Sequence, residues 1–342
     1  MFDKRGAKPK RKRGAATAAA ASLLLALTAC ATSNGASGAG PTGGNLAAPC
    51  STAMTVSYLP SGDASPLALG NQKGFFKNEG IDLTVASTSG GAEGIAGLVS
   101  GEFQMAYGST LPYMQALENG LPLAAVSGAQ WQTENQKVAS SNGLIFAAPD
   151  GPIHSVSDLK GKKIGVNVRG SILEFIATVT LEKAGVSASD VTFVEIPFPS
   201  STDALKAGRV DAIVTGEPFT TIARNAGMKV IADPYLAFEN PFNSAIYMST
   251  TSYLQSHPHE VACFQRAIRA SLDYAQAHPD EASQVVAQIT KIDPGIVAQM
   301  GHAYWTADLG MASLGEQADL AAKYKFLKEK PDVSKIFAVP SQ

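Results

Sequence analysis

Residues 163–196 read KIGVNVRGSILEFIATVTLEKAGVSASDVTFVEI, and this stretch decides the fold. The apolar residues at 163–168 and 191–196 are typical of buried strands, and those at 171–184 have the spacing of a helix. Gly185 marks the end of that helix. A strand, a helix and a second strand in this order predict a parallel βαβ unit.

The same alternation continues on both sides of this unit. Further strands are predicted at residues 54–59, 81–86, 103–108, 123–128, 210–214 and 229–232. Helices are predicted between them at residues 66–78, 92–100, 111–119, 202–207 and 219–226. Beyond residue 249 the pattern is almost wholly helical, with helices expected at residues 258–277, 280–290 and 294–303. The sequence therefore predicts an α/β fold.

Two apolar runs, at residues 143–148 and 243–249, join the two halves of this pattern. We therefore predict a discontinuous first domain, residues 50–147 and 244–342, with a second domain, residues 148–243, inserted into it. The two chain crossings would form a hinge between two α/β domains. A body of this kind binds its ligand in the cleft between the lobes and closes around it.

The N-terminus predicts export. Residues 1–29 contain seven Lys or Arg residues and an apolar run at 14–29. As a helix that run would rise about 24 Å, short of the roughly 30 Å bilayer core, which indicates a signal peptide and not a membrane span. The run ends in LTAC, which resembles the lipobox of bacterial lipoproteins, so Cys30 is expected to carry a palmitate-type lipid anchor outside the membrane. The alternative is an ordinary cleavable signal.

Residues 30–49 carry no charge and almost no large apolar side chain, and they predict a flexible tether. The remaining cysteines are Cys50 and Cys263. In an oxidising compartment these two thiols could form a disulfide. The alternative is that Cys263 is a small buried hydrophobe in its predicted helix.

Composition excludes several classes of protein. The chain has 342 residues, of which 45% are hydrophobic and 16% charged, so it can build two cores and is too apolar to be disordered. Without the first 29 residues it has 20 basic and 28 acidic side chains. A body this acidic repels phosphate backbones, so no nucleic-acid partner is expected.

Motifs for catalysis are missing from the sequence. It contains no nucleophile elbow, no Walker A loop and no dinucleotide-binding glycine pattern. The one histidine cluster, His257 and His259, lacks partners at metal-ligand spacing. We therefore predict a protein that is not an enzyme, has no metal or cofactor, and is a monomer.

Five segments in this order resemble the solute-binding proteins of bacterial ABC importers, in the group that binds nitrate, sulfonates, taurine and thiamine-pyrimidine precursors. They are KGFFKNEGIDL (73–83), GG (90–91) with LVSGE (98–102), DLKGKKIGV (158–166), ALKAGRVDA (204–212) and EPF (217–219). Gln104 stands where that group usually has Asp. The resemblance implies a periplasmic-binding-protein fold and delivery of a small-molecule ligand to a permease in the cytoplasmic membrane.

Two alternative functions belong to other classes of protein. One is a sensor that presents its ligand to a membrane receptor. The other is an extracytoplasmic enzyme of thiamine-pyrimidine metabolism, although the fungal enzymes related by fold use a Cys-rich motif that this chain lacks. Sulfonates, nitrate-like anions, aromatic carboxylates and pyrimidines all suit the loops described next.

In open parallel sheets, ligands bind beyond the carboxyl ends of the strands, where helix N-termini present free N–H groups. This rule selects six loops, at residues 61–63, 87–90, 109–110, 169–171, 198–200 and 215–217. They are small, hydroxylated or glycine-containing, so backbone amides and hydroxyls could contact a ligand. The alternative is ordinary helix capping. The candidate ligand-binding residues are Ser61, Gly62, Asp63, Ser87, Thr88, Ser89, Ser109, Thr110, Gly170, Ser171, Ser200 and Thr215.

Three larger side chains complete the candidate site. Arg169 could hold a sulfonate, carboxylate or phosphate, or it could pair at the surface with Glu174, which is at capping-box spacing from Ser171. Glu217 favours a cationic or hydrogen-donating ligand. Arg169 and Glu217 could bind the two ends of a zwitterion or pair with each other. Trp131 could stack on an aromatic ligand or pack at the hinge.

Overall fold

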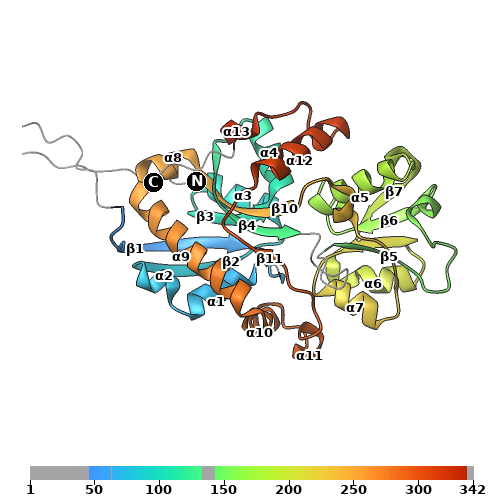
Figure 1. The fold of residues 1–342 in the computed structure, drawn as a ribbon, viewed down its shortest axis with the longest axis horizontal. Helices are drawn as coiled ribbons and strands as arrows, with labels where there is room; N and C mark the ends of the chain where they lie inside the picture. The colour runs from blue at the N-terminus through green and yellow to red at the C-terminus, as the bar shows by residue number, and fades with distance from the viewer. Residues whose placement is uncertain (1–45, 63, 133–142, 337–342) are drawn as a thin grey trace, which may run out of the picture. The chain divides into compact units, whose positions relative to one another are not determined.

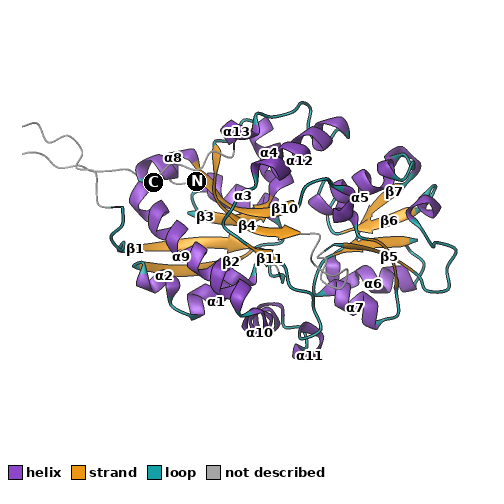
Figure 2. Ribbon diagram, in the orientation of Figure 1, coloured by secondary structure: helices purple, strands orange, loops and turns teal. Residues whose placement is uncertain are grey.

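The computed structural model describes residues 46–62, 64–132 and 143–336. In these residues the chain forms two mixed β-sheets, each with helices against it (Figure 1). Strands and helices alternate through most of the chain, and helices dominate its last part (Figure 2). The α/β class predicted from the sequence is confirmed.

The first sheet has six strands in the order β11-β4-β10-β3-β1-β2. Their bounds are β1 Thr52–Tyr58, β2 Ile81–Ser87, β3 Met105–Ser109, β4 Leu123–Gln132, β10 Phe242–Thr250 and β11 Tyr304–Trp305. β1 is parallel to β2 and β3, whereas β10 is antiparallel to β3 and β4. The strands β1 to β4 therefore all end at one edge of the sheet, where β10 begins.

The second sheet has five strands in the order β7-β6-β8-β5-β9. Their bounds are β5 Leu144–Ala147, β6 Lys163–Val166, β7 Thr192–Glu195, β8 Ala212–Thr215 and β9 Lys229–Ala232. β6 is parallel to β7 and β8, and β5 is antiparallel to β8 and β9. The parallel strands again end at one edge, where β5 begins.

The helices follow from apolar spacing. In α9 (Pro258–Ala277) the buried residues Val261, Phe264, Ile268 and Leu272 recur every three or four positions, which places them on one face. Phe264 contacts the rings of Phe76 and Tyr247 at centroid distances of 5.9 and 5.6 Å, so this face packs against α2 and the first sheet.

The other helices near the first sheet are α1 Ser65–Gln72, α2 Phe75–Asn78, α3 Gly91–Ser100, α4 Thr110–Glu118, α8 Thr251–Ser256, α10 Pro279–Thr290, α11 Pro294–Val297, α12 Met311–Lys323 and α13 Val333–Ile336. Those near the second sheet are α5 Ile172–Lys183, α6 Phe198–Lys206 and α7 Phe219–Asn225, with short 3-10 turns at Val156–Leu159, Ala188–Asp190 and Pro234–Ala237. A separate core of this region contains the fully buried Leu144, Phe146 and Ile213.

Three predicted helices are wrong in extent. The helix expected at 202–207 begins at Phe198, so the predicted loop at 198–200 is the first turn of α6. The helix expected at 66–78 is two helices, because Gly74 adopts a left-handed conformation (φ 81°) at the start of α2. The helix expected at 294–303 ends at Val297, and Tyr304 and Trp305 instead pair with β4. Pairing with a distant strand leaves no periodic signal in the local sequence.

The predicted boundary between the domains also needs correction. Residues 144–147 were assigned to the first domain, but they form β5, a strand of the second sheet. Similarly, Phe242 and Asn243 pair with β4 of the first sheet and not with the second. A short, fully buried apolar run has no alternation, so its sequence cannot indicate which sheet it joins. The division into two domains stays a prediction.

The start of the described chain is held against α9. A disulfide joins Cys50 to Cys263, with their Cα atoms 6.3 Å apart. Arg266 donates hydrogen bonds to the carbonyl oxygens of Leu46 and Ala48 and forms an ion pair with Glu79 at 2.7 Å. In the part of the chain that the structure describes, no helix combines the length and apolar character needed to cross a bilayer.

Candidate ligand-binding site

The loop that follows β8 of the second sheet carries Glu217. Its carboxylate contacts a segment that lies beside the first sheet. Glu217 lies between β8 and α7, and the Glu217–Pro218 peptide is cis. Its carboxylate accepts hydrogen bonds from the backbone N–H and the hydroxyl of Thr221, both at 3.0 Å. It also accepts one from the N–H of Gly301 at 3.5 Å. Since Gly301 lies between α11 and β11, this bond links the two regions.

Gly62, in the loop after β1, meets Glu217 from the first-sheet side. A Cβ added at Gly62 would lie 3.7 Å from the Cβ of Glu217 and 3.2 Å from the terminal methyl of Met300. The absence of a side chain therefore allows the loop after β1 and the loop after β8 to approach closely. These two predicted loops do come together.

A small cavity lies at this contact. Its described lining residues include Gly62, Ser65, Glu217, Ser283, Met300, Gly301, His302 and Trp305, and none of them is Lys or Arg. The cavity volume is ≈ 10 Å³, about the lower limit for one water molecule. In this conformation the cavity is too small for an organic solute, so a solute could bind there only after the two sides separate.

Burial controls the electrostatics of this cavity. Glu217 is 4% exposed, and burial raises the pKa of its carboxyl, although the donors on Thr221 and Gly301 and the charge of Arg224 act in the opposite direction. Burial likewise lowers the pKa of His302, which favours the neutral imidazole, and Asp280 partly opposes this. Both shifts favour the uncharged forms of the two side chains.

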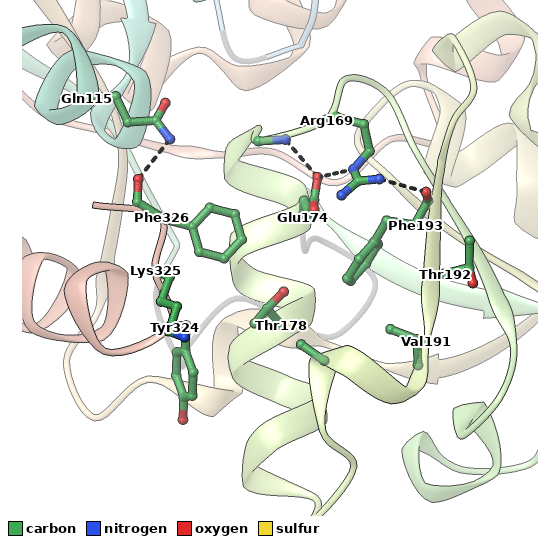
Figure 3. Close-up of a pocket in the computed structure, with 12 residues that line it drawn as sticks. Gln115, Arg169, Glu174, Thr178, Val191, Thr192, Phe193, Tyr324, Lys325 and Phe326 are labelled. Carbon is green, nitrogen blue, oxygen red and sulfur yellow. Dashed lines mark hydrogen bonds and ion pairs between the residues drawn. The ribbon is translucent and has the colours of Figure 1, made fainter. Parts of the chain in front are cut away.

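Arg169 lies elsewhere, in an open groove of ≈ 530 Å³ lined by Gln115, Glu174, Thr178, Phe193, Tyr324, Lys325 and Phe326 among others (Figure 3). Its Nε is 2.9 Å from the Glu174 carboxylate, and its Nη1 donates to the Phe193 carbonyl at 3.0 Å. The side chain is 55% exposed. Arg169 thus pairs with Glu174, and its groove shares no described lining residue with the Glu217 cavity.

Comparison with known proteins assigns the chain to a family. Residues 62–282 match the family described as NMT1/THI5 like. The chain belongs to the NMT1/THI5-like family. A putative aliphatic sulfonates-binding protein of Bacillus subtilis is 24% identical over 68% of this chain and 69% of its own length. A 4-amino-5-hydroxymethyl-2-methylpyrimidine phosphate synthase of Aspergillus parasiticus is 25% identical over 64% of each chain.

Among solved structures, the alkanesulfonate-binding protein SsuA of Xanthomonas axonopodis pv. citri, bound to MOPS, superposes with a TM-score of 0.70. It is 18% identical, and the match covers 86% of this chain and 100% of that one. The NMT1/THI5-like chain therefore has the periplasmic-binding-protein fold, as the sequence predicted. The family match includes Gly62 and Glu217 and ends before Gly301, so one side of the cavity lies outside the matched residues.

Four predicted hydroxyls of this NMT1/THI5-like protein bond to the protein itself, two of them locally and two across the fold. Ser61 and Thr88 donate to the carbonyl oxygens of Leu59 and Tyr58, and Thr110 donates to Gln317 at 2.6 Å. Ser171 accepts from the Glu174 N–H and so begins α5. The bonds of Ser61 and Ser171 match the capping alternative, whereas Thr88 and Thr110 bond to residues 30 and 207 positions away in the sequence.

The remaining predicted residues have mixed surroundings. The hydroxyl of Thr215 is fully buried and has no hydrogen-bond partner among the described residues. Ser87 and Ser200 are exposed, and Ser109 is half-buried. Asp63 and Cys30 lie outside the described residues.

Trp131 packs against other parts of the protein and is not among the described residues that line the Glu217 cavity. Its indole N–H donates to the Asp308 carbonyl at 3.0 Å, and its ring lies over Gly310, where an added Cβ would be 2.2 Å away. This corresponds to the packing alternative.

Met300, Gly301 and His302 line the cavity but are not among the residues predicted from the sequence. They lie 83 to 85 positions from Glu217 and follow a helix, α11, and not a parallel strand, so the rule for strand ends does not reach them. The sequence pattern itself contains no signal for them.

Proposed function

We propose that this NMT1/THI5-like protein is the extracytoplasmic solute-binding component of an ABC importer. The observation that carries this proposal is the bond from the Gly301 N–H to the Glu217 carboxylate. It joins an element beside the first sheet to a strand end of the second, with a closed cavity at the contact. Closure of two sides around a guest is how binding proteins of this fold class would capture a solute.

In this proposal a small organic solute enters while the two sides are apart. Closure then buries it at the carboxyl ends of the strands, among the loops after β1 and β8 and the segment at 300–302. The permease in the cytoplasmic membrane would recognise the closed form, because only that form presents both sides in a fixed arrangement. Sulfonates and pyrimidines are the solute classes to test first, given the names of the relatives. Nitrate-like anions and aromatic carboxylates, which also suit the predicted loops, complete the four classes.

We also propose that the body is lipid-anchored through Cys30. The first described residues support this, because Arg266, His259 and the Cys50–Cys263 disulfide hold the chain against α9 from Leu46 onward. A tether leaving that point would have a fixed origin on the body. Replacing Cys30→Ala should move the protein from the membrane fraction to the soluble fraction, and an unchanged membrane fraction would contradict the anchor.

We propose that the protein binds its solute and does not convert it, although one relative is named as a synthase. The fungal enzymes of that type use a Cys-rich motif. This chain has three cysteines, of which Cys50 and Cys263 are joined to each other. Recovery of every stabilising solute unaltered after incubation with the protein is the expected result, and a new product would support the enzyme alternative.

A thermal-shift screen tests the central proposal. A solute present at 100 times its Kd should add about 2.7 kcal/mol to the free energy of unfolding. The screen should contain the four solute classes above together with amines and amidines. Stabilisation by at least one small solute is expected. A broad panel that leaves the melting temperature unchanged would contradict a solute-binding function.

A further inference from the structure

The groove that contains Arg169 differs from the Glu217 cavity in size and in lining. Its volume of ≈ 530 Å³ lies in the range of small-molecule sites, whereas the Glu217 cavity has room for about one water molecule. The two share no described lining residue. Figure 3 shows the rings of Phe326 and Phe193 on opposite sides of the α5 face that carries Thr178. The groove therefore has aromatic walls and a polar group between them.

Thr178 offers a buried hydroxyl to this groove. The residue is 3% exposed and lines the groove, and its hydroxyl makes no hydrogen bond to any described residue. A threonine hydroxyl inside a helix commonly donates to the carbonyl four residues earlier, as Thr180 of the same helix does to Ile176 at 2.8 Å. A buried hydroxyl without a partner costs free energy. A ligand in the groove would supply the missing partner.

Arg169 has an unused donor at the same groove. Its Nε and Nη1 donate to the Glu174 carboxylate and the Phe193 carbonyl, at 2.9 and 3.0 Å. The guanidinium also lies over the Phe193 ring, with its central carbon 5.9 Å from the ring centroid. The remaining nitrogen, Nη2, makes no hydrogen bond to a described residue. These contacts orient the guanidinium and leave Nη2 for a ligand.

Positive charge predominates among the described residues that line the groove. They contain Arg169, Lys325 and a single carboxylate, Glu174, which is 6% exposed and bonded to Arg169. The ammonium of Lys325 makes no ion pair or hydrogen bond with a described residue. Glu195 accepts from the Arg169 backbone N–H at 3.2 Å but is not among the lining residues. An anion is therefore favoured here, although the body as a whole is acidic, with 20 basic and 28 acidic side chains after the first 29 residues.

We propose that this groove is a second binding site, separate from the solute cavity, for a small aromatic anion. The anionic head accepts a charge-assisted hydrogen bond from Nη2 of Arg169. Thr178 lies one helical turn beyond Glu174, which Arg169 contacts, so its hydroxyl bonds to a second polar group of the same molecule. The aromatic ring lies between Phe193 and Phe326.

Probes with one skeleton and different charges test the class of ligand. They are 4-hydroxyphenylacetate, 4-hydroxyphenylacetamide and tyramine, each titrated calorimetrically into the purified full chain. The anion should bind about tenfold or more tightly than the amide, because only the anion gains the charge-assisted bond. Tyramine should bind no more tightly than the amide. Absence of anion binding, or binding of the amide or the amine as tight as that of the anion, would overturn the proposal.

Removal of the guanidinium locates the anionic head. Arg169→Ala should weaken binding of 4-hydroxyphenylacetate by about tenfold or more. Lys206→Ala is the matched control, because it also removes one positive charge but lies exposed at the end of α6, outside the groove. It should bind the anion as the wild type does. The unliganded melting temperature of each variant shows whether it is folded.

A second pair of variants locates the other polar group. Thr178→Val replaces the unpartnered hydroxyl with a methyl group of similar size, so the protein should stay folded. It should weaken binding of 4-hydroxyphenylacetate by about threefold or more and leave the affinity for phenylacetate, which lacks the hydroxyl, unchanged. Thr180→Val is the matched control on the same helix, because the Thr180 hydroxyl bonds to Ile176 and does not line the groove. It should change neither affinity.

The remaining outcomes also decide the proposal. Unchanged affinity for the anion in a folded Arg169→Ala variant would place the anion elsewhere on the protein and overturn the groove site. Equal effects of Thr178→Val and Thr180→Val would overturn the contact with Thr178. The solute-binding function proposed above would stand in each case, because the Glu217 cavity contains none of these residues.

Discussion

Glu174 and Glu217 are buried carboxylates in two strand–loop–helix units of one sheet, but Glu174 lies in the first turn of α5 whereas Glu217 precedes α7. Glu174 bonds to its own helix start and to Arg169, all within the second-sheet region. Glu217 bonds to its own helix start and to Gly301, which lies beside the first sheet. A carboxylate inside the first turn of its helix therefore stabilises one region here, whereas the carboxylate in the loop before its helix reaches the other region.

A change remote from both cavities separates stability from binding. Cys263→Ala removes a disulfide that spans 213 residues and should lower the free energy of unfolding by about 2–5 kcal/mol. Solute affinity should stay within twofold, because neither Cys50 nor Cys263 lines either cavity. Chemical denaturation and titration measure the two quantities. A large loss of affinity in a folded variant would mean that the Cys50 region takes part in the site.

The next largest effect should come from the Glu217 cavity. Gly62→Leu places side-chain atoms between Glu217 and Met300, where even a Cβ would lie 3.2 Å from the Met300 methyl group. Closure should be blocked, so affinity should fall at least about 100-fold, or about 2.8 kcal/mol. Gly315→Leu is the control, because a Cβ there meets nothing within 4 Å. Equal affinity in both variants would contradict closure at Gly62.

Glu217 should make the stability of the protein depend on pH. Burial raises the pKa of Glu217 above its ordinary value of 4.5 in the folded state. The folded protein therefore holds more protons than the unfolded chain just above pH 4.5, and the stability contributed by this group falls as pH rises through that window. Glu217→Gln should gain stability relative to the wild type over the same window. Denaturation at several pH values measures the free energy of unfolding of both proteins. A difference between wild type and variant that stays constant with pH would contradict this.

The smallest effect should come from Arg169. Its ion pair with Glu174 is more than half exposed on the arginine side, and such pairs contribute about 0–1 kcal/mol. Arg169→Ala should therefore change stability by no more than about 1 kcal/mol and leave solute affinity within twofold. Titration of the variant checks this. Loss of binding would place Arg169 in the site and would favour an anionic ligand.

Local pattern was sufficient for most of the fold. The stretch at 163–196 formed the predicted strand, helix and strand, because each element has its own period and Ser171 begins the helix. The sequence pattern failed to predict an element where the strand that it pairs with is distant in the sequence. The run at 144–147 is apolar on both faces, so nothing in it indicates the second sheet. Gly74 divided a predicted helix because a glycine can adopt a positive φ.

The candidate site was less predictable than the fold. The rule for strand ends selected Gly62 and Glu217, which do meet. It could not select Gly301, since only the tertiary fold brings that residue to Glu217. It also could not show that Arg169 bonds to Glu174, because spacing allowed either Glu174 or Glu217 as its partner. Partner choice among charged side chains depends on packing, which the local sequence does not record.

The central claim is that a solute is captured when the Glu217 side closes on the Gly301 side. Nitroxide labels at two exposed positions, Glu102 beside the first sheet and Lys206 at the end of α6, would report the separation of the two regions. With a saturating solute, electron–electron distance measurement should give a single, shorter and narrower distribution than without it. An identical distribution with and without bound solute would contradict the account.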